Sequence, residues 1–143
     1  MDSQDKKIKK PTAYKRNKTF FSAVINAFNG FLTMLLRERN FRIHIVIALI
    51  IFLVGLYFDL SRSDWLWITI GVAFAVLSEI LNTIIEAVVD LIVGAQYNDL
   101  AKVAKDVASA GVVFAVIVEF IIFALIFQPY IWNYYGLNQV ITH

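Results

Sequence analysis

The sequence contains no cysteine and only two histidines, His44 and His143. The absence of cysteine excludes disulfide bonds, thiolate metal sites and cysteine nucleophiles. Two histidines cannot build a multi-histidine metal site within one copy of the chain, so any metal is expected to have oxygen ligands, with magnesium as the natural candidate. The net charge is only +2, and this small excess gives no indication of nucleic-acid binding.

Charged residues are also scarce, at 17% of the 143 residues, whereas 59% are hydrophobic. A soluble domain has about 25% charged and about 45 to 50% apolar residues. A transmembrane helix needs about 20 mostly apolar residues. Three segments meet or approach this length, which predicts an all-α membrane protein with spans at 41–58, 65–93 and 106–127.

The residues on either side of these spans have different characters. Residues 1–18 are polar and lysine-rich, and we expect a disordered basic arm. In 20–37, apolar residues recur every three or four positions, which is typical of an amphipathic helix on the membrane surface. The tail, 128–143, is rich in aromatic residues that favour a membrane interface. The sequence therefore predicts a membrane domain at 19–127 between two terminal segments.

The distribution of basic residues predicts the orientation. Ten of the 13 lysine and arginine residues precede the apolar run that begins at Ile43 in the first span. Positive residues are retained in the cytoplasm, so we expect a cytoplasmic N-terminus and, after three crossings, an extracytoplasmic C-terminus.

The second span carries a polar stripe in its second half. Glu79, Asn82, Glu86 and Asp90 follow one another at steps of three, four and four residues, which confines them to a helical sector roughly 80° wide. A carboxylate inside a bilayer costs about 2.5 kcal/mol or more, so such residues usually face protein, water, a cation or a reacting group. Pairing with nearby lysine and arginine residues is the alternative, but Glu79 lies too deep for it.

Other residues at the same membrane depth have the chemistry of a phosphate site. Glu38, before the first span, can join Glu86 in holding magnesium, and Lys105 and Asp106 open the third span. Magnesium needs only one or two carboxylates besides phosphate oxygens and water, and a lysine neutralises phosphate as a point charge. No P-loop or protein-kinase signature is present in the sequence.

Three sequence segments carry a family resemblance: EILNTIIEAVVD at 79–90, QYNDLAKVAKDVASAG at 96–111 and RERNFRIH at 37–44. Over residues 20–127 the chain resembles the prokaryotic diacylglycerol kinase and undecaprenol kinase family of small membrane enzymes. The resemblance implies a homotrimer in the bacterial cell membrane, with active sites between protomers at the cytoplasmic surface. It also implies transfer of the γ-phosphoryl group of ATP, with magnesium, to a lipid alcohol.

The same resemblance implies individual roles. Glu79 matches the general base that meets the lipid hydroxyl, and Glu38 and Glu86 match the magnesium ligands. Lys18 stands beside Thr19, where part of the family has an arginine. Together with Lys18, the expected nucleotide-binding residues are Asn82, Asp90, Gln96, Tyr97, Asn98, Lys105 and Asp106.

The sequence leaves alternatives for the acceptor lipid and for the class of function. The NDLAKVAKD loop and the FRIH sequence look more like the undecaprenol kinase branch, which favours undecaprenol over diacylglycerol as acceptor. A hypothesis of another class is a small transporter or scaffold that uses the acidic stripe for cation or proton passage and makes no use of ATP.

Overall fold

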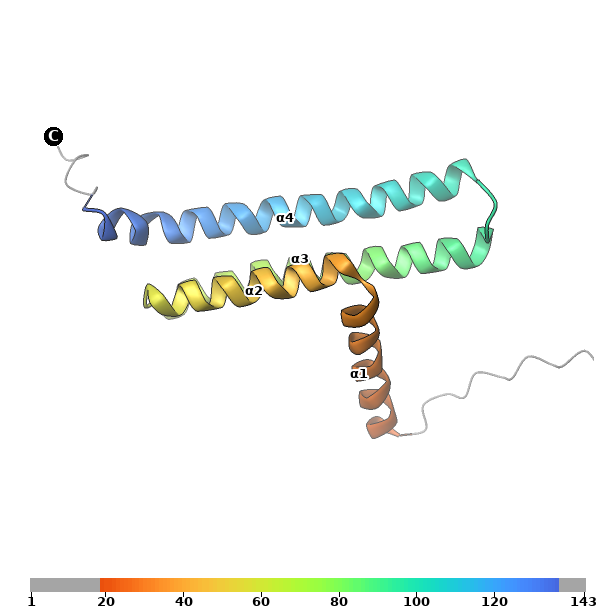
Figure 1. Cartoon of the computed structure of the whole chain (residues 1–143), viewed down its shortest axis with the longest axis horizontal. Helices are drawn as coiled ribbons and strands as arrows, with labels where there is room; N and C mark the ends of the chain where they lie inside the picture. Colours follow the sequence, from red (N-terminus) through yellow and green to blue (C-terminus); the bar gives the residue numbers. More distant parts are fainter. Residues whose placement is uncertain (1–18, 137–143) are drawn as a thin grey trace, which may run out of the picture. The chain divides into compact units, whose positions relative to one another are not determined.

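The structure is a computed structural model that describes residues 19–136. Within that range it contains only helices: α1 (Phe20–Arg37), α2 (Arg39–Tyr57), α3 (Arg62–Val93) and α4 (Asp99–Tyr134) (Figure 1). All four are long and apolar enough to cross a membrane. The predicted all-α membrane class is therefore confirmed. The predicted basic arm at 1–18, including Lys18, and residues 137–143 lie outside the described residues.

Helix α1 belongs to one structural unit, residues 1–36, and α2, α3 and α4 belong to a second, residues 37–143. None of the α1 residues is buried within the structure, and Phe20 and Phe21 are 86% and 73% exposed. Because apolar side chains of this kind need a nonpolar environment, α1 fits contact with lipid. Its position on the membrane surface stays a prediction, since its length and composition also suit a crossing helix.

In the second unit, α3 packs against both α2 and α4. Helices α3 and α4 form a long antiparallel hairpin, and α2 lies along the first part of α3 (Figure 1). The buried apolar residues are few, and most large apolar side chains point outward. An outward apolar surface is what a hydrocarbon environment requires. The polar positions that are buried are therefore the informative ones.

The helix ends follow local sequence signals. Ser61 and Asp64 form a capping box at the start of α3, and the Asn98 side chain accepts a hydrogen bond of 3.1 Å from the Ala101 amide at the start of α4. Gly94, where α3 ends, adopts a positive φ of 62°, which favours glycine. Gly94 and the Asn98 cap bound the short turn between α3 and α4.

Helix α4 is longer at both ends than the span predicted at 106–127. It begins at Asp99 and continues through Pro129 to Tyr134. The prediction followed the apolar run, but a helix extends into polar sequence wherever a cap and backbone hydrogen bonds support it. The first residues of the aromatic tail are therefore helical.

The last turns of α4 contact the α2–α3 loop. The Tyr130 hydroxyl donates a hydrogen bond of 2.6 Å to Asp64 Oδ2 and accepts one of 3.3 Å from the Ser61 amide. The Phe58 ring packs against Tyr130, with ring centroids 6.3 Å apart, and against Phe127 and Tyr134. We call the contacts of Tyr130 with Asp64 and Ser61 the Tyr130 clasp.

Gly55 allows the close approach of α2 and the start of α3. A Cβ at this position would lie 2.7 Å from the Trp65 ring and 3.0 Å from Leu60 Cδ1. We expect Gly55→Ala to destabilise the protein, because overpacking costs about 1 to 3 kcal/mol and outweighs the gain of about 1 kcal/mol in helix propensity.

Thermal unfolding in detergent measures this difference. Gly30→Ala is the matched control, because a Cβ at Gly30 meets no atom within 4 Å. The control is expected to unfold at an unchanged or higher temperature. Equal unfolding temperatures for the two variants would contradict this prediction, because they would mean that the Trp65 ring moves aside with no loss of stability.

Candidate active site

The polar stripe predicted on the second span lies on α3 and becomes more buried with depth. Asp90 is exposed and Glu86 is half-buried, whereas Asn82 is 7% exposed and Glu79 only 2%. Glu79 is thus the most enclosed charged side chain among residues 19–136. Burial of a carboxylate requires a compensating partner, so this position calls for a donor, a cation or a reacting group.

Glu79 faces the beginning of α2. The negative charges of Glu86 and Glu38 act on its carboxyl group, and the side chain of Asn40 is within hydrogen-bonding reach of it. The other oxygen, Oε2, has no hydrogen-bond partner in the part of the chain that the structure describes. The structure therefore brings Glu79 near the two carboxylates that the sequence predicted as metal ligands.

The predicted magnesium site can be compared with the carboxylates that the structure provides. Within residues 19–136, no group of three or more histidine, aspartate or glutamate side chains is arranged to hold a metal ion by itself. Glu38 and Glu86 supply two carboxylates, which suits magnesium when phosphate oxygens and water complete the shell. The residues fit a metal that arrives with a nucleotide rather than one held by protein ligands alone.

Asn82 connects the buried and exposed parts of the stripe. Its Nδ2 donates a hydrogen bond of 3.0 Å to Glu86 Oε1. Its Oδ1 is buried and has no partner among the described residues. Asn82 therefore orients Glu86 through one side of its amide and offers a free acceptor on the other.

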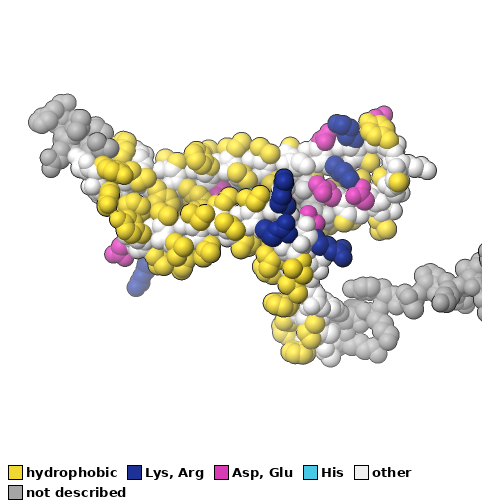
Figure 2. Space-filling view, in the orientation of Figure 1, with side chains coloured by type: hydrophobic (Ala, Val, Ile, Leu, Met, Phe, Trp, Pro, Cys, Tyr) yellow, Lys and Arg dark blue, Asp and Glu magenta, His cyan; other side chains and the backbone are white. Residues whose placement is uncertain are grey.

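Two ion pairs lie at the end of the hairpin that holds the α3–α4 loop. Lys105 Nζ lies 2.5 Å from Asp90 Oδ1, and Lys102 Nζ lies 2.6 Å from Asp106 Oδ2. Figure 2 shows most of the visible charged side chains between the start of α2 and this loop, a few at the opposite end of the unit, and apolar side chains over most of the rest. Exposed pairs of this kind contribute about 0 to 1 kcal/mol, so a phosphate group can displace the carboxylates from both lysines.

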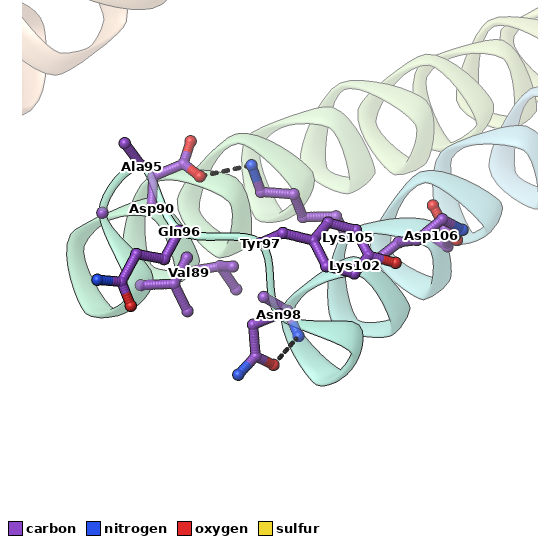
Figure 3. A pocket seen from close by; sticks show the side chains of 12 residues that line it. Val89, Asp90, Ala95, Gln96, Tyr97, Asn98, Lys102, Lys105 and Asp106 are labelled. Carbon is purple, nitrogen blue, oxygen red and sulfur yellow. Dashed lines mark hydrogen bonds and ion pairs between the residues drawn. The ribbon is translucent and has the colours of Figure 1, made fainter.

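A cavity of about 430 Å³ lies between these ion pairs and the loop. The Gln96, Tyr97 and Asn98 side chains come from the loop, whereas Asp90 comes from α3 (Figure 3). The predicted nucleotide-binding residues that line this cavity are Asp90, Gln96, Tyr97, Asn98, Lys105 and Asp106. Asn82 does not line it, and Lys18 lies outside the described residues.

Lys102 also lines the cavity and was not among the predicted site residues. It precedes Lys105 by three residues and Asp106 by four, so it lies on the same side of α4. That spacing is the signal that identifies it from sequence. The cavity therefore has two lysines available for phosphate groups.

The fold and these residues define a class, a helical membrane protein with a buried carboxylate on the helix whose end lines a charged cavity. The sequence pattern of the family described as prokaryotic diacylglycerol kinase matches residues 25–127. The chain therefore belongs to the prokaryotic diacylglycerol kinase family, which is a family of membrane lipid kinases. This confirms the family predicted from the sequence.

Individual relatives agree with this assignment. The chain is 32% identical over 124 residues to a diacylglycerol kinase of Escherichia coli strain K12, covering 84% of this chain and 98% of the relative. It is 28% identical over 131 residues to one of Helicobacter pylori strain J99, covering 92% and 94%. It is 34% identical over 92 residues to one of Synechocystis, covering 64% of this chain and 53% of that longer relative.

Proposed function

We propose that this protein transfers the γ-phosphoryl group of ATP to the hydroxyl group of a lipid alcohol in the bacterial cell membrane. The observation that carries the proposal is the position of Glu79, a carboxylate 2% exposed within an apolar span, on the same helix as the charged cavity at Asp90. A lipid hydroxyl and a water-soluble nucleotide can meet only where a membrane span reaches a charged surface.

The reaction needs few protein groups. The hydroxyl oxygen forms a bond to the γ-phosphorus, the bond from that phosphorus to the oxygen of the departing ADP breaks, and the hydroxyl proton passes to Glu79. Phosphoryl transfer depends mainly on alignment and charge neutralisation. A general base contributes about 100-fold to 10,000-fold, and Glu79 Oε2 is free to accept a proton.

In this proposal the nucleotide occupies the cavity at the α3–α4 loop. Lys102 and Lys105 leave their carboxylate partners and neutralise the phosphates, while Gln96, Tyr97 and Asn98 also line the cavity. Glu38 and Glu86 hold magnesium, which when bound neutralises charge on the phosphate oxygens. Asn82 keeps Glu86 oriented through its hydrogen bond.

The proposal includes an orientation and an assembly. The excess of basic residues in the first 42 residues supports an orientation with the N-terminus and the nucleotide cavity on the cytoplasmic side, where ATP is available, and the end of α4 outside. Family resemblance supports a homotrimer whose sites form between protomers. The outward apolar side chains of α2 to α4 are compatible with contacts to lipid or to further copies.

The acceptor lipid has two candidates. The names of the relatives favour diacylglycerol, which would be converted to phosphatidic acid. The NDLAKVAKD and FRIH segments favour undecaprenol, which would be converted to undecaprenyl phosphate. Both acceptors carry one primary hydroxyl group and long hydrocarbon chains, so the same site chemistry serves either.

Purified protein in lipid nanodiscs tests the activity and the acceptor together. With labelled ATP and magnesium, we expect label in the lipid when diacylglycerol or undecaprenol is supplied alone, and the preferred acceptor to dominate when both compete. Folded protein that labels neither lipid would contradict the kinase proposal and would favour the transporter or scaffold hypothesis.

A further inference from the structure

A hollow lies on one face of α2, close to the start of the helix. Its volume is about 230 Å³. We call it the α2 hollow, and its lining residues are Arg39, Arg42, Ile43, Val46 and Ile47. Residues three and four positions apart share a helix face. The buried residues of α2, among them Phe41 and His44, lie on the side that packs against α3, so the α2 hollow faces away from α3.

The α2 hollow combines two kinds of side chain. Arg39 and Arg42 are exposed and carry a permanent positive charge. The other three lining residues are apolar and also exposed. In Figure 2, basic side chains (dark blue) lie at the start of α2 beside apolar side chains (yellow) along the helix. A small anion would contact only the arginines, and a hydrocarbon only the apolar part. An amphiphile with an anionic headgroup contacts both, because it matches the charge and the apolar surface.

The apolar part of this face continues along α2 beyond the hollow. Its exposed apolar residues are Ile43, Val46, Ile47, Ile50, Leu53 and Val54. From position 43 to position 54 a helix rises about 16 Å. One leaflet of a bilayer contributes about 15 Å of hydrocarbon, which is half of a core of about 30 Å. The face therefore has the length of one lipid chain whose headgroup lies at the arginines.

The presence of two arginines indicates the type of headgroup. Arg39 and Arg42 are three residues apart, about 4.5 Å along the helix axis. A guanidinium group binds phosphate best through two parallel hydrogen bonds to two oxygens. A phosphodiester has only two unesterified oxygens, which serve one such contact. A phosphomonoester has three oxygens and a charge of about −1.5 to −2 at pH 7, so it can serve two guanidinium groups that share one oxygen and can balance both their charges.

We propose that the α2 hollow binds a lipid phosphomonoester, with its phosphate group held by Arg39 and Arg42 and one hydrocarbon chain along the apolar residues of the same face. The phosphorylated lipid that the proposed reaction makes belongs to this class, whichever alcohol is the acceptor. The inference rests on the proposed function for the source of this ligand and not for its binding. Because the hollow faces away from α3, which carries Glu79, the lipid bound there is product that has left the site of phosphoryl transfer.

Photolabelling of the full chain in phosphatidylcholine nanodiscs, without ATP, tests the proposal. We expect a photoreactive phosphatidic acid to label α2 peptides at least about tenfold more than a phosphatidylglycerol with the same photoreactive chains. Joint replacement Arg39→Gln and Arg42→Gln should lower this labelling at least about tenfold. Arg37→Gln is the matched control, because Arg37 is an exposed arginine that does not line the hollow, and its labelling should stay within about twofold of native.

A second variant separates the geometry of the arginines from their charge. Joint replacement Arg39→Lys and Arg42→Lys keeps both positive charges, but an ammonium group is a point charge without the planar fork of a guanidinium group. We expect this variant to bind both probes and to lose the preference, so that phosphatidic acid and phosphatidylglycerol label α2 within about twofold of each other. Native unfolding temperatures in detergent would verify that these exposed substitutions leave the fold intact.

Other results would overturn the assignment of the α2 hollow. Equal labelling of the native protein by the two probes would exclude a preference for a phosphomonoester. An equal loss in Arg37→Gln would mean that labelling follows general surface charge. Displacement of the probe by soluble glycerol phosphate would show that the hydrocarbon chain is not needed. Dissociation of an oligomer by the glutamine substitutions would assign the arginines to a second copy of the chain.

The binding result and the kinase result are independent. Preferred labelling of α2 by phosphatidic acid without any lipid phosphorylation from ATP would support the hollow and contradict the kinase proposal. Lipid phosphorylation without such labelling would leave the kinase proposal intact and overturn the hollow.

Discussion

Glu79→Gln is expected to lower kcat by about 100-fold to 10,000-fold, the range that a positioned general base contributes. Glutamine has nearly the same volume and can still hydrogen-bond, but it cannot take the proton of the lipid hydroxyl. The KM for ATP should change little, because Glu79 does not line the charged cavity. Steady-state kinetics with labelled ATP and a saturating lipid acceptor measures both quantities.

Glu119→Gln is the matched control for this prediction. Glu119 is also buried, at 6% exposed, but it lies on α4 beside Gly71, far along the hairpin from the loop. The same chemical change there should leave kcat within about twofold, an effect of about 0.4 kcal/mol. Native turnover in Glu79→Gln, or an equal loss in both variants, would refute the assignment of Glu79 as the base.

Removal of the two proposed metal ligands is expected to have the second large effect. Glu38→Gln and Glu86→Gln should each raise the magnesium concentration for half-maximal activity at least about tenfold, equivalent to about 1.4 kcal/mol of binding. The double variant should need still more magnesium. Magnesium titration at fixed ATP and fixed lipid gives the values.

Asp59→Asn is the control for this test, because it removes a carboxylate that lies away from the proposed magnesium site. Asp59 lies in the α2–α3 loop with a φ of 51°, a conformation that asparagine also tolerates. We expect its magnesium dependence to match that of the native protein. A shift in Asp59→Asn as large as those in the glutamate variants would mean that the titration reports general surface charge.

The sequence predicted the helical class and the stripe on α3 because both follow from periodicity. Steps of three and four residues must share a helix face, and Glu79, Asn82 and Asp90 do so in the structure. The quoted motifs also predicted the family that the match over 25–127 confirmed. Local pattern was sufficient for these conclusions.

Other features depend on contacts between helices, which periodicity along one helix does not contain. The free oxygens of Glu79 and Asn82 become evident only when α2 and α4 are packed against α3. The ion pair of Lys105 with Asp90 crosses from α4 to α3, so its partner could not be chosen from spacing alone. The extension of α4 to Tyr134 depends on caps and tertiary contacts rather than on apolar composition.

The Tyr130 clasp gives the hairpin unequal ends. At one end, Tyr130 fastens α4 to Asp64 and to the Ser61 amide. At the other, α3 and α4 are joined by exposed ion pairs and a turn at Gly94. Breathing motions that admit and release a nucleotide should therefore pivot about the aromatic end and have their largest amplitude at the loop.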